Sequence, residues 1–178
     1  MNSKMLALKV MLIGCVTTIT MVEVAEAQTT SLKTEYLMTL QANLKPPSVV
    51  SNNFRVFDVP SGSVEGPRIK GKIVPPTGDW SRTIAPGVNR LDVKLVIQTD
   101  DDQIIHVSYN GVAQCPKEIS DKLANGELAK ADDCYFIGAP TFETNSERYS
   151  WLSSVQAVAK MVELKRGSHV RYEIFLVK

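Results

Sequence analysis

Histidine and cysteine are scarce in this chain, and their scarcity limits the chemistry that it can carry. The sequence contains two histidines, His106 and His169, and three cysteines. Cys115 and Cys134 do not have the spacing of a zinc site, and only the two histidines could join them. Glycine-rich phosphate loops and nucleophile elbows are also missing. We therefore expect no metal and no cofactor, and no motif names a reaction.

The chain also lacks an excess of either charge and a long apolar run. Lysine and arginine number 20 and aspartate and glutamate 19, which gives a formal net charge of +1. Nucleic-acid binding needs a basic stripe, so this balance argues against nucleic acid and against electrostatic binding to membranes. A membrane-spanning helix needs about 20 predominantly apolar residues. The apolar run Val10–Val22 is shorter and contains Thr17, Thr18 and Thr20, so we expect no membrane span.

The first 27 residues have the pattern of a secretory signal peptide. Lys4 and Lys9 form a basic start, the apolar run follows, and Ala25-Glu26-Ala27 is a small-x-small cleavage site. Cleavage after Ala27 leaves one domain, residues 28–178, exported to the periplasm or secreted. The alternative is a lipoprotein anchored at Cys15, because Leu12-Ile13-Gly14-Cys15 resembles a lipoprotein box.

Export places the two remaining cysteines in an oxidising compartment, where a disulfide between Cys115 and Cys134 is plausible. Closing a loop of that size would add about 3 kcal/mol in the chain-entropy model. The alternative is a pair of free thiols. The segment between them, Pro116–Ala131, alternates charges around a few apolar residues and is interrupted by Gly126, which predicts a short surface helix or a long loop.

Most of the remaining chain alternates apolar and polar residues over short runs, which is typical of β-strands. The clearest strand is Arg90–Thr99, with Leu91, Val93, Leu95 and Ile97 on one face. The acidic turn after it returns the chain as a hairpin. The other expected strands are Thr34–Ala42, in which Tyr36, Met38 and Leu40 share a face, Asn53–Val59, Arg68–Val74, Gln103–Asn110, His169–Val177 and Tyr135–Thr144, the last broken at Pro140.

Three segments are less regular. Gly71 lies within the Arg68–Val74 strand, which indicates a bulge, a bend or a close approach of another backbone. Ser81–Asn89 is expected to be a loop with its turn at Pro86-Gly87. Trp151–Leu164 has apolar residues at helical spacing, so periodicity alone favours a helix there.

Many short strands with near-regular turns predict an all-β fold, either an antiparallel sandwich or a barrel. A barrel is attractive because closure removes exposed sheet edges. The ordered motifs Gly66-Pro67-x-x-x-Gly71, Gly78-Asp79-Trp80, Arg90–Lys94, Thr99-Asp100-Asp101 and Phe142-Glu143-Thr144 carry a resemblance from about Tyr36 to the end of the chain.

These motifs resemble the domain of unknown function family numbered 3237, also called the UPF 0311 proteins. The resemblance implies a single antiparallel up-and-down β-barrel similar to the calycins and lipocalins, with no established activity. It also implies that Trp151–Met161 is a strand, which we adopt over the helical periodicity.

The sequence departs from the family at Lys94 and Ile137, where arginine is usual, at Asp102, where glycine is usual, and at Ser153, where asparagine is usual. An aspartate can adopt the left-handed conformation that the turn at Asp102 requires.

An eight-stranded barrel can hold one small ligand in its lumen. The candidate ligand-binding residues are acids, a lysine, a histidine and the two tryptophans, namely Asp79, Trp80, Asp92, Lys94, His106, Glu143 and Trp151. Composition favours placing Asp92 and Lys94 on the solvent face of their strand. The functional alternative places them in the lumen as a charge pair. A buried charge pair seldom stabilises a protein, so in that case the pair would be retained for a binding or catalytic site.

Three functions remain open. The first is an exported module that binds a small, partly apolar molecule in the lumen. The second is an enzyme of the same shape, with Asp92 or Glu143 as a general base. The third is a structural or interaction protein with a filled barrel. Burial separates them: a carboxylate with a raised pKa in an open cavity favours the enzyme, an apolar open cavity favours binding, and a packed lumen favours the third.

Overall fold

The structure, a computed structural model, describes residues 31–178. Leu32–Lys178 forms one compact unit. The expected signal peptide, its cleavage site and the alternative lipid anchor at Cys15 lie outside the described residues. Within the described part of the chain, no helix has the length and apolar character needed to cross a membrane.

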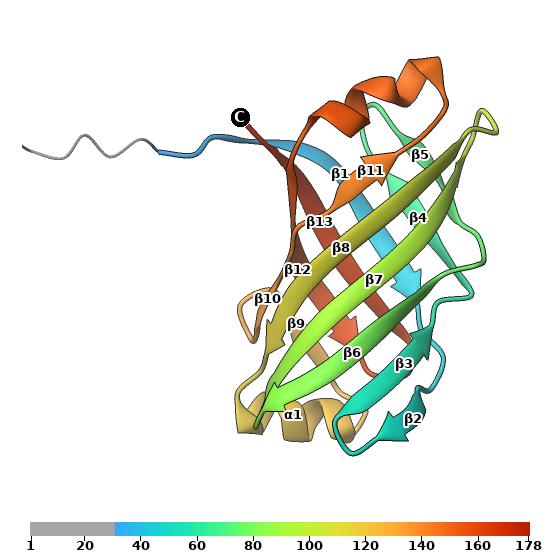
Figure 1. The fold of residues 1–178 in the computed structure, drawn as a ribbon. Helices are drawn as coiled ribbons and strands as arrows, with labels where there is room; N and C mark the ends of the chain where they lie inside the picture. Colours follow the sequence, from blue (N-terminus) through green and yellow to red (C-terminus); the bar gives the residue numbers. More distant parts are fainter. Residues whose placement is uncertain (1–30) are drawn as a thin grey trace, which may run out of the picture. The chain divides into compact units, whose positions relative to one another are not determined.

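Antiparallel strands make up most of the unit, as expected (Figure 1). The strands are β1 (Thr34–Asn43), β2 (Ser48–Ser51), β3 (Phe54–Asp58), β4 (Ser61–Glu65), β5 (Lys70–Ile73), β6 (Gly78–Ala85), β7 (Val88–Thr99), β8 (Ile104–Gln114), β9 (Leu128–Lys130), β10 (Tyr135–Gly138), β11 (Thr141–Glu143), β12 (Ala157–Lys165) and β13 (His169–Val177). Two short helices accompany them, α1 (Lys117–Ala124) and the 3-10 helix η1 (Glu147–Ser154).

The strands close into a barrel. The ring runs β1–β4–β5–β7–β8–β10–β12–β13 and returns to β1. The closure is uneven, because β6 continues the edge of β7 beyond β5 and carries β3 and then β2. Among the described residues β2 pairs with β3 alone, so the barrel ends in a free edge there. The expected barrel is confirmed.

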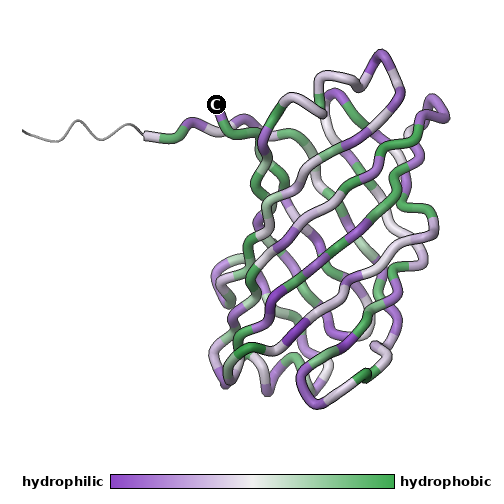
Figure 2. The backbone as a smooth tube through the Cα atoms, viewed as in Figure 1, coloured by the Kyte–Doolittle hydropathy of each residue, from purple (hydrophilic) through white to green (hydrophobic). Residues whose placement is uncertain are grey.

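Hydrophobic and hydrophilic residues alternate along many of the strands (Figure 2), and the burial of the hydrophobic ones places the apolar face of these strands in the lumen. On β7, Leu91, Val93, Leu95 and Ile97 are all buried, at 5% exposure or less, while the residues between them are half-buried. The β7–β8 hairpin turns at Asp102, whose φ of 59° is left-handed. The prediction that an aspartate can replace glycine at this turn is confirmed.

The two ends of the barrel differ. At the η1 end the lumen is packed with aliphatic side chains that are almost inaccessible to solvent, among them Met38, Ile97, Ile105, Leu152 and Met161. The other end carries α1, β2 and the β12–β13 turn (Figure 1). Leu123 of α1 is buried at that end, so the helix covers part of the barrel opening.

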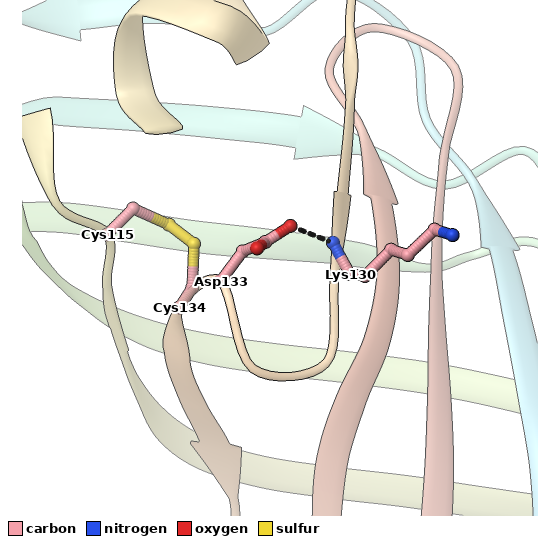
Figure 3. Close-up of a disulfide and its surroundings, with 4 residues drawn as sticks. All are labelled: Cys115, Lys130, Asp133 and Cys134. Carbon is pink, nitrogen blue, oxygen red and sulfur yellow. Dashed lines mark hydrogen bonds between the residues drawn. A yellow bond between two sulfur atoms is a disulfide. The ribbon is translucent and has the colours of Figure 1, made fainter. Parts of the chain in front are cut away.

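The disulfide joins Cys115 to Cys134, which are separated by 19 positions (Figure 3). It ties the end of β8 to the start of β10, and α1 with β9 forms the excursion between them. The backbone N–H of Lys130 donates to Asp133 Oδ2 at 2.7 Å and holds the return of this excursion. The expected short helix ends before Gly126, whose φ is 80°.

Three local expectations are wrong. Ser81–Ala85 is not a loop but part of β6, and only the turn at Pro86-Gly87 is as expected. The strand expected over Trp151–Met161 is wrong for residues 151–154, which belong to η1, and right from Ala157 on, where β12 begins and pairs with β13. Tyr36 does not share a face with Met38, because a bulge between them brings Leu37 and Met38 both inward and leaves Tyr36 exposed.

Gly71 marks a close approach of two backbones, one of the three outcomes expected from a glycine within a strand. A Cβ at this position would lie 2.3 Å from the backbone oxygen of Gln98 on β7. The absence of a side chain lets β5 pair tightly with the far end of β7, where Gly71 faces Thr99.

Candidate functional site

A cavity of about 480 Å³ occupies the lumen at the α1 end of the barrel. Its wall is built from inward-facing positions on successive strands: Thr83, Ser81 and Asp79 on β6, Asn89, Leu91, Val93 and Leu95 on β7, Ala113 and Tyr109 on β8, and Val170 and Tyr172 on β13. In each strand this order runs from the mouth to the interior. Thr83 and Asp79 are four positions apart on β6, so the cavity reaches about 13 Å along the strand.

Most of the wall is apolar, and the polar side chains that line it include two arginines on the side of the mouth and one carboxyl with two tyrosines towards the interior. Arg55, Asn89 and Arg166 line the part near the mouth, and Asp79, Tyr109 and Tyr172 line the interior. The mouth is bordered by Ser120 and Leu123 of α1 and by Gly167 in the β12–β13 turn. The disulfide lies at this border, because Cys115 also lines the cavity.

Asp79 is the one acid among the lining residues. Burial in the apolar lumen raises its pKa to about 7, and the negative charge of Asp92 adds to the rise. The backbone N–H of Asp92 donates to Asp79 Oδ1 at 3.2 Å, and this hydrogen bond opposes the rise in the pKa of Asp79. Asp79 therefore carries a proton in a large fraction of molecules near neutral pH.

Two tyrosines stand near Asp79. Tyr109 and Tyr172 pack edge to face, with ring centroids 6.1 Å apart. Burial raises the pKa of both hydroxyls, and the charge of Asp79 raises them further. Both tyrosines stay neutral and can donate or accept hydrogen bonds.

Gly138 on β10 makes room for Tyr109. A Cβ on Gly138 would lie 2.9 Å from Cδ2 of the Tyr109 ring. Phe136, two residues earlier on the same face, packs edge to face on Tyr172 at 5.6 Å and completes the aromatic end of the cavity. The inner end is thus an aromatic wall that contains one carboxyl and two hydroxyls.

Of the residues expected to bind a ligand, Asp79 alone lines this cavity. Trp80 follows it on β6, points outward by strand alternation and is 40% exposed. Trp151 lies on η1 at the opposite end of the barrel, under the Arg68 guanidinium at 3.9 Å.

The remaining candidates lie on the outer face. Asp92 and Lys94 pair with each other there, with side chains 50% and 43% exposed, so the lumen placement is wrong and the solvent-face alternative is right. His106 and Glu143 are cross-strand neighbours, 3.9 Å apart, with side chains 40% and 84% exposed. The cause is the same in each case, because these residues alternate with inward-facing apolar residues such as Val93 and Val107.

Sequence reasoning missed Arg55, Tyr109 and Tyr172. For Tyr172 the sequence did indicate an inward-facing side chain, since it shares an apolar strand face with Val170 and Ile174. Tyr109 carried a similar signal as the last inward position of the expected Gln103–Asn110 strand. Arg55 gave none, because a lone arginine in a short strand is normally a solvent-facing residue.

These features define a β-barrel with an open, mostly apolar lumen cavity and a single carboxyl at its inner end. Residues 32–177 match the family described as protein of unknown function, DUF3237. The chain belongs to this family.

Known relatives agree with this assignment. A UPF0311 protein from Rhodopseudomonas palustris strain TIE-1 is 29% identical over 128 residues, covering 70% of this chain and 84% of the relative. The crystal structure of a conserved protein of unknown function from R. palustris has a TM-score of 0.77 at 27% identity, covering 85% of this chain and all of that one. A β-barrel-like protein from Acinetobacter baumannii has a TM-score of 0.68 at 25% identity, covering 86% of this chain and 100% of that one.

Proposed function

We propose that this protein is an exported barrel that binds a small, mostly apolar molecule in the lumen at its α1 end. The observation that carries the proposal is the cavity of about 480 Å³, whose wall is mainly aliphatic and aromatic. Small-molecule sites have volumes of about 300–1,000 Å³, apolar walls and a few convergent polar groups. The cavity has all three properties.

The packing of the barrel supports a binding role over a purely structural one. The η1 end is filled with aliphatic side chains, which is sufficient to hold the fold together. A structural barrel has no need of a second, open compartment lined by leucine, valine and phenylalanine, because each unfilled volume forfeits packing contacts. The open half is the part of the fold that we assign to a ligand.

Export is part of the proposal. The disulfide is compatible with an oxidising compartment, and the first residues have the pattern of a signal peptide.

A probe titration tests the binding proposal. The neutral fluorophore N-phenyl-1-naphthylamine is small enough for the cavity, and its emission rises in apolar surroundings. We expect saturable binding at one site per chain. Ala113→Trp places a large ring in the wall and should abolish it, while Val112→Trp, the outward-facing neighbour on β8, should leave it intact. Failure of the wild-type protein to bind, or equal binding by both variants, would overturn the proposal.

A second candidate function is catalysis, and Asp79 is the observation that favours it. A carboxyl with a pKa of about 7 in a cavity can accept and return a proton near neutral pH. Asp92 and Glu143, the bases expected from the sequence, face solvent and are not in the cavity. If Asp79 is catalytic, native mass spectrometry of wild-type and Asp79→Asn protein from the same host compartment should show bound molecules of different mass. The same bound mass in both proteins would favour binding alone.

A further inference from the structure

Two arginines at the mouth of the cavity have no partner in the described part of the chain. Arg55 and Arg166 both line the cavity, and neither forms an ion pair or a side-chain hydrogen bond with a described residue. By contrast, Arg68, Arg148 and Arg171 each have a carboxylate within 3.3 Å. An arginine side chain has five N–H donors that seek acceptors, and its planar shape suits a carboxylate.

The nearby carboxylates do not neutralise these arginines. Asp58, on the same strand as Arg55, is held by Lys45 at 2.7 Å. Glu163, three residues before Arg166, accepts from His169 at 2.8 Å and from Arg171 at 2.9 Å. The mouth therefore keeps an uncompensated positive charge beside an apolar interior.

The interior has the opposite character. Asp79 lies at the inner end, and the groups that set its pKa include no cation. An anionic group placed there would be repelled whenever Asp79 is ionised, and would lose its hydration in the apolar lumen. A ligand with one anionic end can therefore enter in one orientation only, with the charge at the mouth.

We propose that the lumen site takes an amphipathic organic acid, with its carboxylate or similar head at Arg55 and Arg166 and its apolar body inside the barrel. This inference rests on the proposed binding function and adds the chemical class and the orientation of the ligand. The inner end, with the Asp79 carboxyl and the hydroxyls of Tyr109 and Tyr172, suits a hydroxyl or carbonyl group at the far end of the molecule.

The positive charge at the mouth should raise the affinity of the site for a ligand with an anionic head. Hydrogen bonds to charged groups contribute about 1.5–3 kcal/mol each in favourable cases, which corresponds to about 10- to 100-fold in the dissociation constant. Because Arg166 is exposed, part of this gain should be screened by salt. The acid should thus bind more tightly than a neutral molecule of equal length, and more so at low ionic strength.

Displacement of N-phenyl-1-naphthylamine by decanoate and by decan-1-ol tests the inference, because the two competitors share a chain length and differ in charge. We expect decanoate to displace the probe at a concentration about tenfold or more below that of decanol. The double variant Arg55→Gln, Arg166→Gln should remove this preference, which is read as the ratio of the two displacing concentrations and does not require an unchanged affinity for the probe. Arg90→Gln is the matched control, since Arg90 is exposed on β7, outside the cavity, and without an ion pair among the described residues.

The outcomes separate the two proposals. If the wild type binds the probe but both competitors act equally, or if the double variant keeps the preference, the organic-acid inference is wrong and the binding function stands. If the wild type does not bind the probe, the binding function fails and the inference fails with it. Retained probe binding in the double variant shows that the barrel is folded and the cavity intact.

Discussion

The backbone N–H of Asp92 donates to the carboxyl of Asp79 across 3.2 Å, from one strand of the barrel to the next. The bond lies where the ladder between β6 and β7 has no paired residues, between the pairs Asp79–Val93 and Arg82–Arg90. A backbone donor that would normally bond to the neighbouring strand is given to a side chain instead. The bond fixes the carboxyl of Asp79 on the lumen side, and this carboxyl is the group on which the pH behaviour of the site depends.

Asp79→Asn should stabilise the protein at pH 8. The folded pKa of about 7 lies above the ordinary value of 3.8, so the folded state binds more protons than the unfolded state between these values. Wild-type stability should therefore fall as pH rises from 4 to 7. The difference in pKa corresponds to at most about 4 kcal/mol at pH 8. Urea unfolding at pH 4.5 and pH 8 measures the effect, which should shrink towards the lower pH.

Asp92→Asn is the control for that measurement, because Asp92 is on the outer face and pairs with Lys94. The variant keeps the backbone N–H and should leave most of the pH dependence in place. A stability difference between wild type and Asp79→Asn that is the same at both pH values would contradict the assignment of a raised pKa to Asp79.

Removal of the disulfide should destabilise the barrel and loosen α1. The crosslink spans 19 positions, and a loop of this size is worth about 3 kcal/mol in the chain-entropy model. We expect Cys115→Ser with Cys134→Ser to lower the urea midpoint. Reducing agent should lower the midpoint of the wild type to a similar extent and leave the double variant unchanged; a wild type indifferent to reduction would show that the bond does not form in solution.

Gly138→Ala should disturb the inner end of the cavity. The new Cβ would lie 2.9 Å from the Tyr109 ring, and overpacking of this kind costs about 1–3 kcal/mol. The test is a double-mutant cycle with Tyr109→Leu, read by urea unfolding. Gly138→Ala should lower the free energy of unfolding by less when Tyr109 is already replaced by leucine. If the two substitutions lower it additively, the contact with the Tyr109 ring is not the cause of the destabilisation.

The ion network on the β12–β13 hairpin should contribute stability that is lost in acid. A hydrogen bond from His169, aided by the charge of Arg171, lowers the pKa of Glu163. A lowered folded pKa stabilises the protein above the unfolded value of 4.5 and loses that contribution as pH falls through the folded pKa. Glu163→Gln should cost about 1 kcal/mol or less at pH 7.

The cost of Glu163→Gln should fade towards pH 3, as followed by thermal unfolding. Glu173→Gln, on the outer face of β13, is the matched control and should show little change at either pH. A constant cost for Glu163→Gln across the range would mean that packing, and not charge, explains it.

Much of the fold could be predicted from alternation and turn chemistry. The hairpin of β7 and β8 followed from four alternating apolar residues and an acidic turn. The left-handed conformation of Asp102 was expected because the family that the sequence resembles usually has glycine there and an aspartate tolerates that conformation. The change in charge pattern between the cysteines predicted a short helix or a long loop, and the structure has the helix. The bulge after Tyr36 could not be predicted, because its two inward neighbours are explained only by pairing with β13.

The site was harder to predict than the fold, for a physical reason. Asp79 was a candidate as an acid beside the aromatic Trp80, but Asp92, Lys94, His106 and Glu143 were candidates too, as charged or titratable residues in strands. Which face of a strand becomes the lumen is decided by the majority of its apolar residues, and on β7 these are Leu91, Val93 and Leu95. The two arginines at the mouth come from segments more than 100 positions apart, so no local sequence pattern could predict that they line the same cavity.

Methyl NMR of the protein during addition of N-phenyl-1-naphthylamine shows directly whether a ligand enters the lumen. We expect shifts at methyl groups that line the cavity, such as those of Leu91, Val93 and Ala113, and constant resonances at the packed end, such as those of Leu152 and Ile105. Shifts confined to the exposed Val49 and Val50 of β2, or no shifts at all, would contradict a ligand site in the lumen.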